Sequence, residues 1–271
     1  MRVRLEGNHS RLHCGCAAVW TSLDRLARQN GWRVVSGSDY DALILNGEGT
    51  MHHSSEGWRR KMKILSEALA SGKSAYLVNT VWQENAADYD DILRGLSGVW
   101  VREVESQRDL RERHGVDATV SPDISIFHLD RPWFGVRDFR GLPVKTDFYS
   151  HEFQNFAVPK TAELVGMKQI AMSGKWGAFV ASLKSAAFLA TGRHHAVYAA
   201  IAARIPFAAM EGNTHKISGI IKTAGAEIPV ARSLAELPEV IRSIDGNRAE
   251  YEKLFDWMAA QRPEAALPAW P

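Results

Sequence analysis

The chain has 271 residues, of which 45% are hydrophobic and 24% charged, and its formal net charge is +2. This length is enough for one large or two smaller α/β domains with a sizeable core. The balanced charge, without a long basic run, argues against nucleic acid as the main ligand. No apolar run reaches the length of a membrane span, and the N-terminus lacks the apolar segment of a signal peptide. We therefore expect a cytoplasmic protein, and leave peripheral contact with the inner face of the membrane open.

The two cysteines, Cys14 and Cys16, are one residue apart. Neighbours at that spacing rarely form a disulfide, which indicates a reducing compartment. A C-x-C pair begins a metal site only if further ligands join it. We favour two small buried residues at the start of a helix and expect no metal.

Apolar runs and helical patterns alternate through the first half of the chain. Strands are expected at 3–5, 32–35, 42–45, 75–79, 99–101 and 116–120, and helices at 16–29, 58–70, 89–96 and 106–114.

Polar loops follow several of these strands. The strand at 42–45 runs into Asn46-Gly47-Glu48-Gly49, where glycines allow either a tight turn or a close approach of the backbone to a ligand. The loop is neither a Walker loop nor G-x-G-x-x-G. Trp82 follows the strand at 75–79, and we expect it to face a cleft.

Arg102 stands where the strand at 99–101 meets the next helix, with Ser106 as a cap. Two interpretations remain open for this arginine. It contributes to a binding site at the strand end, or it forms a surface ion pair with Glu105 or Asp109.

An aromatic stretch with several prolines and glycines follows residue 129, and we place the domain crossing within it. The expected domains are 1–132 and 133–271, with the last helix, 248–260, able to pack back across the first. Expected strands of the second domain are 144–148, 167–172, 187–190, 207–210 and 228–231. Expected helices are 160–165, 176–186 and 215–224, with an alanine-rich helix that follows Gly192 and is closed by Arg204.

The triplet Arg193-His194-His195 lies between the strand at 187–190 and the alanine-rich helix that follows it. Ligands of open parallel sheets bind at this edge, and helix N-termini favour anions. Arginine suits phosphate or carboxylate, and histidine moves protons near neutral pH. The alternative, a solvated arginine beside a core histidine, is about equally favoured on position alone.

Several short motifs resemble, in order and spacing, those of the polysaccharide pyruvyl transferase family. They are Asn46-Gly47-Glu48-Gly49, Arg102-Glu103-Val104-Glu105-Ser106, Pro122-Asp123, Thr191-Gly192-Arg193-His194-His195-Ala196 with Ala200 to Pro206, and Lys216 with Gly219. The loop lacks the family's glycine run, and His194 stands where the family more often has an aliphatic residue.

The resemblance implies an α/β fold class with two Rossmann-like domains in a glycosyltransferase-B-like arrangement. It implies transfer of pyruvate from phosphoenolpyruvate to a sugar of a polysaccharide, or of its lipid-linked precursor, as a cyclic ketal. The implied reaction uses phosphoenolpyruvate as a co-substrate and requires neither a cofactor nor a metal. The acceptor would bind the first domain and the donor the second.

The residue roles that follow are expectations. His195 and Arg193 would be catalytic, and Arg102, Arg193, His194 and Lys216 would bind phosphoenolpyruvate. The acceptor would contact Asn8, Gly47, Glu48, His52 and Trp82.

Two alternatives stay open. A glycosyltransferase of the same architecture would use these cations to grip the diphosphate of a nucleotide sugar. A degenerate carbohydrate-binding protein is less favoured, because Arg193, His195 and Lys216 are all retained.

Overall fold

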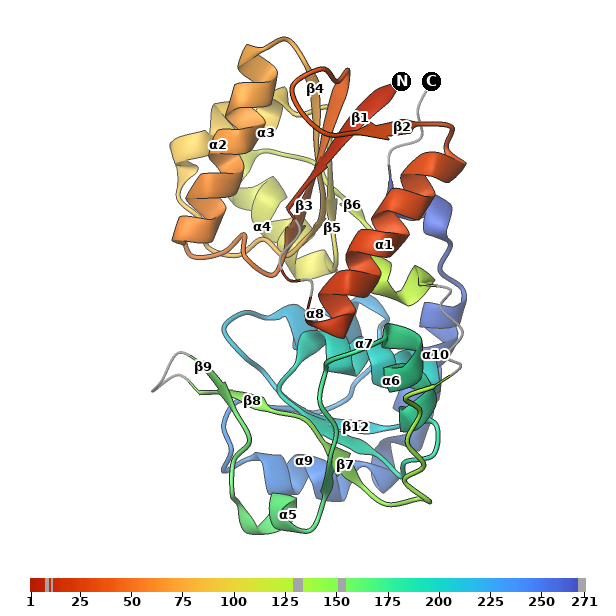
Figure 1. Ribbon diagram of the computed structural model, residues 1–271. Coiled ribbons are helices and arrows are strands. Elements are labelled where there is room, and N and C mark those ends of the chain that lie inside the picture. The colour runs from red at the N-terminus through yellow and green to blue at the C-terminus, as the bar shows by residue number, and fades with distance from the viewer. Residues whose placement is uncertain (8–9, 11, 129–133, 151–154, 268–271) are drawn as a thin grey trace. The chain divides into compact units, whose positions relative to one another are not determined.

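The computed structural model describes residues 1–7, 10, 12–128, 134–150 and 155–267 (Figure 1). The chain divides into two compact units. The first unit comprises Met1–His9, Trp20–Ile124 and Gln261–Pro271, and the second comprises Ser10–Val19 and Ser125–Ala260. The expected boundary between residues 132 and 133 lies outside the described residues and stays a prediction.

A parallel six-stranded sheet forms the centre of the first unit, in the order β2-β1-β3-β4-β5-β6. Its strands are β1 (Arg2–Glu6), β2 (Arg33–Val35), β3 (Ala42–Glu48), β4 (Ser74–Thr80), β5 (Gly98–Val101) and β6 (Thr119–Val120). Every residue of β3 is buried, as expected for a central strand of a doubly covered parallel sheet. The strand order reverses between β1 and β3, where ligands of such sheets bind.

The helical elements between these strands are α2 (Glu56–Ala70), η1 (Ala87–Tyr89), α3 (Asp90–Gly95) and α4 (Val104–His114), with η4 (Pro263–Ala266) near the end of the chain. Helix α2 begins earlier than the sequence predicts, because the Ser55 hydroxyl accepts a hydrogen bond from the Trp58 N–H and caps it. Its buried apolar residues, including Trp58 and Met62, form one core with residues of β3 and β4.

The second unit contains a parallel five-stranded sheet in the order β10-β7-β11-β12-β13. Its strands are β7 (Val144–Lys145), β10 (Lys168–Gln169), β11 (Leu189–Thr191), β12 (Phe207–Met210) and β13 (Val230–Ala231). The predicted strand 144–148 is wrong in its extent. It is divided into β7 and a separate strand, β8 (Phe148–Ser150), which pairs antiparallel with β9 (Asn155–Ala157).

The helical elements of the second unit are η2 (Ile124–Phe127), which starts on the last residue of the first unit, α5 (Ala162–Val165), α6 (Trp176–Leu183), α7 (His194–Ala203), α8 (Lys216–Thr223), α9 (Leu237–Ser243), η3 (Asp245–Asn247) and α10 (Arg248–Ala259). Every residue of α7 except Ala202 is buried. Its alanines allow this, because small side chains let other elements pack closely around it.

Helix α10 packs against other elements of the second unit. The expected contact of this helix with the first domain stays a prediction. Helix α10 contacts α7, and the Tyr251 hydroxyl donates to the Phe207 carbonyl in β12. Buried Leu254 and Phe255 join the core of this unit. The apolar face of this helix is thus buried within its own unit.

Helix α1 (Cys14–Gln29) begins in the second unit and continues in the first. Two backbone contacts hold its start. The Cys14 N–H donates to the Met172 carbonyl at 2.9 Å, and His13 forms a β-bridge with Ser173. In the part of the chain that the structure describes, no helix is both long and apolar enough to cross a bilayer.

Candidate functional site

The strand order of the second unit reverses between β7 and β11, so their carboxyl ends form the expected binding edge. The hydroxyls of Thr146 and Thr191 are hydrogen-bonded to each other across this edge. Both hydroxyls are buried, and each threonine directly follows or ends its strand. The edge is therefore a fixed polar framework for the residues that follow.

Arg193 and Asp147 extend from this framework as a bidentate ion pair. The Arg193 Nε donates to Asp147 Oδ1 at 2.8 Å, and Nη2 donates to Oδ2 at 2.5 Å. The guanidinium also lies over the Phe156 ring, with Cζ 3.4 Å from the ring centroid. Both charged side chains are about a quarter exposed, at 26% and 28%. Asp147 and Phe156 thus orient the Arg193 guanidinium, which keeps an exposed surface from which it can reach an anion.

A pocket of about 410 Å³ opens beside this ion pair. A volume of this size suits a small-molecule ligand. Its polar lining residues are Ser10, His13, Asp147, Gln169, Ser173 and Arg193. His195 and Lys216 are not among the residues that line it, so the pocket brings together Arg193 and His13 rather than the predicted set.

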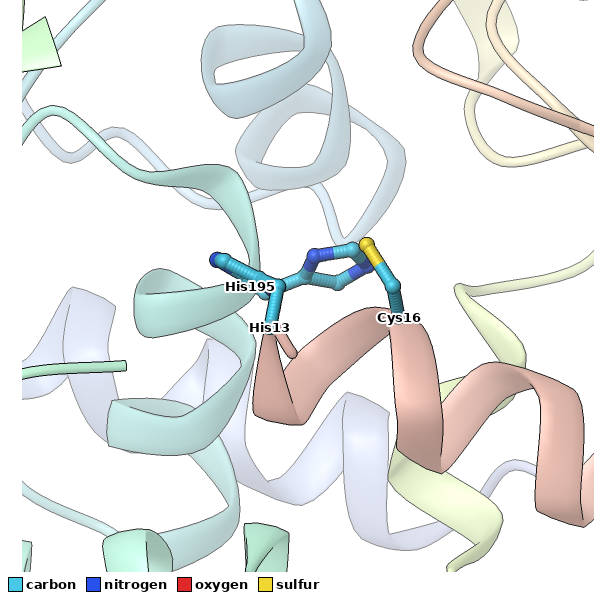
Figure 2. Close-up of side chains that lie close together, drawn as sticks. All are labelled: His13, Cys16 and His195. Atoms are coloured by element: carbon cyan, nitrogen blue, oxygen red, sulfur yellow. The ribbon is translucent and has the colours of Figure 1, made fainter. Parts of the chain in front are cut away.

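The histidines of α7 lie in its first turn and are largely buried, with exposures of 6% for His194 and 9% for His195. The His194 ring packs on Tyr198, with centroids 4.7 Å apart. The His195 ring lies 5.4 Å from that of His13 (Figure 2). Gly15 makes this approach possible, because a Cβ there would stand 2.4 Å from the Cγ of His195.

Lys216 begins α8 and donates to the Asn213 side chain at 2.8 Å. The N-terminus of this helix already holds a carboxylate. Glu211 accepts hydrogen bonds from the N–H groups of Ile217 and Ser218 at 3.0 and 2.9 Å. The side chain of Glu211 therefore occupies the position that a helix N-terminus offers to an anion.

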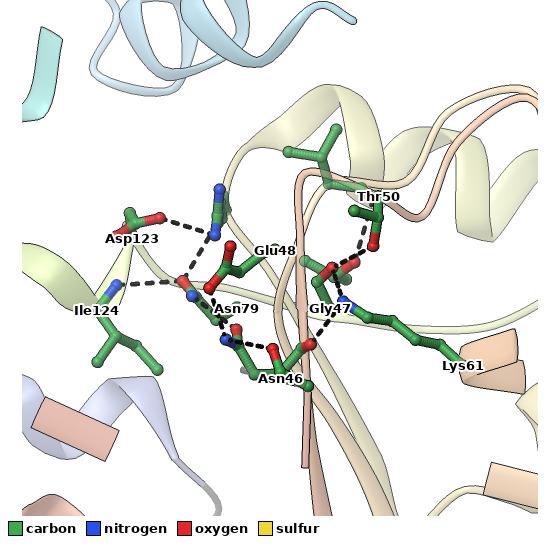
Figure 3. A network of polar contacts seen from close by, with 12 residues as sticks. Asn46, Gly47, Glu48, Thr50, Lys61, Asn79, Asp123 and Ile124 are labelled. Carbon is green, nitrogen blue, oxygen red and sulfur yellow. Dashed lines mark hydrogen bonds and ion pairs between the residues drawn. The ribbon is translucent and has the colours of Figure 1, made fainter. Parts of the chain in front are cut away.

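A second polar cluster lies at the carboxyl ends of β3, β4 and β5 in the first unit (Figure 3). Asn46 donates to Glu48 at 3.0 Å and accepts from Asn79 at 2.9 Å. The side-chain Oδ1 of Asn79 accepts from Arg102 Nε at 3.2 Å, and Arg102 forms an ion pair with Asp123 at 2.8 Å. All five side chains are at most 3% exposed. We name these five residues the strand-end network.

Arg102 is therefore a buried member of this network and not a surface residue paired with Glu105 or Asp109, which corrects that alternative. Its partner Asp123 is fully buried. Removing one partner of a buried ion pair destabilises the fold, because the other charge is left desolvated and uncompensated. The structure thus assigns Arg102 an internal role in the first unit.

The backbone beneath the network is held in an uncommon conformation. Glu48 and Asn79 both have positive φ, at 46° and 54°. Buried Lys61 donates to the carbonyls of Asn46 and Gly47 at 2.9 and 2.6 Å. Non-glycine residues at positive φ are concentrated at functional sites, where surrounding contacts hold them. Lys61 provides such contacts for the Asn46–Gly49 loop.

The remaining predicted acceptor residues are separate from this network. His52 bridges Gln83 and contacts His53 through their Nδ1 atoms at 2.9 Å. The Trp82 ring is fully buried between Trp58 and His114, so its predicted contact with a sugar is wrong and it belongs to the core. Asn8 lies outside the described residues.

Sequence reasoning missed Asp147, Asn79, Lys61 and His13 as site residues. Asp147 and Asn79 stand at strand ends. A polar residue at a strand end is the signal that identified Arg102, and applying this signal to every strand would have found both. Lys61 lies on a helix at a spacing that suggests an ordinary charged residue, and His13 gains its position only from long-range contacts.

Comparison with known families gives one match. The model of the family described as "Polysaccharide pyruvyl transferase" matches residues 7–213. No curated protein sequence is significantly similar to the chain.

Several solved structures are similar to this chain in fold, at low sequence identity. S. aureus MnaA with UDP is 7% identical, with a TM-score of 0.67 over 98% of this chain and 93% of that one. UDP-GlcNAc 2-epimerase from Neisseria meningitidis bound to UDP-GlcNAc is 9% identical, with a TM-score of 0.60 over 94% of each chain. A UDP-glucosyltransferase from Polygonum tinctorium is 10% identical, with a TM-score of 0.54 over 96% and 94%. These likenesses confirm the fold class, α/β with two Rossmann-like units.

Proposed function

Because this chain belongs to the polysaccharide pyruvyl transferase family, we propose that it transfers pyruvate from phosphoenolpyruvate to a sugar as a cyclic ketal. The proposal depends on the orientation of Arg193. The ion pair with Asp147 holds this arginine beside the pocket, at the edge where the strand order of the second unit reverses. Phosphoenolpyruvate carries a phosphate and a carboxylate, and an oriented guanidinium binds either group through paired hydrogen bonds.

The reaction joins two hydroxyls of one sugar to C2 of the donor. A proton adds to the methylene carbon and makes it a methyl group, while the first hydroxyl oxygen bonds to C2. The second hydroxyl oxygen then bonds to C2 as the bond from C2 to the phosphate oxygen breaks. One hydroxyl proton is thus balanced by the new methyl hydrogen, and the other leaves with the phosphate.

The residues divide this work in our proposal. Arg193 stabilises charge on the departing phosphate, with His194 and Lys216 as further donor contacts. His195 transfers a proton. We leave Arg102 out of the donor site, because its side chain is buried against Asp123 and Asn79.

The acceptor belongs to the first unit in this proposal. Glu48 and Gly47 form the loop supported by Lys61, and His52 follows it. We propose a sugar of a lipid-linked precursor as acceptor, which would bring the protein to the inner face of the membrane.

The test is release of inorganic phosphate from phosphoenolpyruvate in the presence of lipid-linked or nucleotide-linked sugars. We expect kcat/KM to fall by about 100-fold or more in Arg193→Ala and in His195→Ala, with the fold checked by circular dichroism. Arg248→Ala removes an exposed arginine from the same unit and should stay within about twofold. Normal turnover in both site variants would contradict the proposal.

A nucleotide-sugar glycosyltransferase is the second candidate, supported by the UDP-bound S. aureus structure and the Polygonum tinctorium enzyme among the similar folds. Arg193 and Lys216 would then bind a diphosphate. Calorimetry with UDP and with phosphoenolpyruvate distinguishes the two. Tight binding of UDP, without binding or turnover of phosphoenolpyruvate, would favour this candidate.

A further inference from the structure

Three side chains with metal-binding atoms converge at the start of α1 (Figure 2). They are His13, Cys16 and His195, and the ligand atoms they offer all lie within 4.8 Å of one another. His13 and Cys16 are three residues apart at a helix start, a spacing that places both on one face. His195 comes from the first turn of α7. All three belong to the second unit.

The backbone around the cluster holds these positions. The β-bridge from His13 to Ser173 and the hydrogen bond from Cys14 to Met172 fix the start of α1. Gly15 separates the two ligands of α1, and its missing side chain leaves the space that the His195 ring fills. The cluster therefore depends on a glycine at this position, which the sequence His13-Cys14-Gly15-Cys16 supplies.

We propose that His13, Cys16 and His195 bind one Zn²⁺ ion. Two imidazoles and one thiolate are a ligand set that zinc accepts, and three protein ligands leave the fourth tetrahedral position for water or an anion. Zinc bonds of about 2.0 Å to nitrogen and about 2.3 Å to sulfur require ligand atoms roughly 3.3–3.5 Å apart. The three ligand atoms start within 4.8 Å of one another, so side-chain rotations must bring them closer when the ion binds.

The surroundings suit the ion in charge and access. Cys16 is 4% exposed and lies in the first turn of α1. His13 lines the pocket beside Arg193, so an ion can enter from that side. Zinc with one thiolate and two neutral imidazoles keeps a single positive charge, which favours an anion at the fourth position.

The proposed zinc site does not depend on the proposed pyruvyl transfer. Zinc binding is measured without substrate, so the two proposals can be tested separately. The two share His195. A zinc-bound imidazole nitrogen cannot carry a proton. Zinc binding and proton transfer therefore compete if both use the same ring nitrogen of His195.

The experiment uses the full chain, stripped with a chelator and titrated with Zn²⁺ against a chromophoric chelator, and separately with Co²⁺. We expect one ion per chain and, with Co²⁺, a sulfur-to-metal charge-transfer band with the strong visible bands of four-coordinate cobalt. Cys16→Ala should abolish the charge-transfer band and weaken Zn²⁺ binding about 100-fold or more. His195→Ala should weaken binding to a similar degree.

Matched controls separate this site from other histidines and the other cysteine. Cys14→Ala and His53→Ala should keep both the stoichiometry and the cobalt spectrum, since Cys14 lies in the core and His53 in the exposed His52–His53 pair. His13 is the partly exposed ligand, so His13→Ala tests the site even if a core variant fails to fold. Absence of zinc binding, or binding that is unchanged in His13→Ala or Cys16→Ala, would overturn the proposal.

Discussion

Arg193 and Asp147 join the carboxyl ends of β11 and β7 through two parallel hydrogen bonds, at 2.8 and 2.5 Å. The pair crosses the point where the strand order of the second unit reverses. An arginine held in this way is oriented before any ligand arrives, which reduces the entropy lost on binding. Asp147 is thus a positioning residue for Arg193.

A double-mutant cycle measures this relationship. We expect Arg193→Ala, Asp147→Ala and the double variant to give a coupling energy of about 1–2 kcal/mol in urea unfolding, because both side chains are only about a quarter exposed. The exposed pair Arg248–Asp245 is the control and should couple by less than about 0.5 kcal/mol. Equal coupling in the two pairs would show that the bidentate geometry contributes nothing.

The buried Arg102 gives a prediction that separates a structural from a ligand-binding role. Arg102→Met should lower the free energy of unfolding by about 3–5 kcal/mol, because it leaves the Asp123 carboxylate buried without its partner. Arg108→Met, on the exposed face of α4, should change it by about 0.5 kcal/mol or less. Unchanged stability in Arg102→Met together with a raised KM for phosphoenolpyruvate would instead restore the donor role.

The contrast between Arg193 and Arg102 shows what could be predicted from the sequence. Alternating apolar runs predicted most of the strands and an α/β fold, because a buried parallel strand is largely apolar. The Rossmann-like form of the two halves came from the family resemblance. The same runs placed both arginines at strand ends. Their partners, Asp147 and Asp123, follow other strands, and a linear pattern does not state which strand ends become neighbours.

Two further differences have the same origin. Trp82 follows a strand and was expected in a cleft, whereas Trp58 and His114, distant in sequence, enclose it. Cys14 and Cys16 gave no third ligand within their own segment, although His195 lies beside them. Long-range packing decides these positions, and local periodicity carries no information about it.

Gly15 provides a stability test whose sign is informative. Inside a helix, glycine to alanine normally stabilises by about 1 kcal/mol. Gly15→Ala should instead destabilise by about 1–3 kcal/mol, because the new Cβ would stand 2.4 Å from His195 Cγ. Gly246→Ala meets no atom within 4 Å and should be neutral or stabilising in the same thermal unfolding assay. A stabilised Gly15→Ala protein would mean that His195 does not pack against α1.

Asp41 gives the pH dependence that the structure supports most directly. The side-chain hydrogen bond from Arg2, together with its backbone N–H, lowers the pKa of Asp41 from 3.8 to about 2. Since the folded pKa lies below the unfolded one, the pair stabilises the fold above pH 3.8 and loses this contribution as the pH falls toward 2. We expect an NMR titration of the Asp41 carboxyl to show a midpoint of about 2, and Arg2→Ala to move it upward toward 3.8.

Arg33→Ala removes the same charge from the neighbouring strand without those hydrogen bonds, and it should leave the midpoint nearly unchanged. Equal upward shifts in the two variants would show that net charge, rather than the Arg2 hydrogen bonds, sets the pKa.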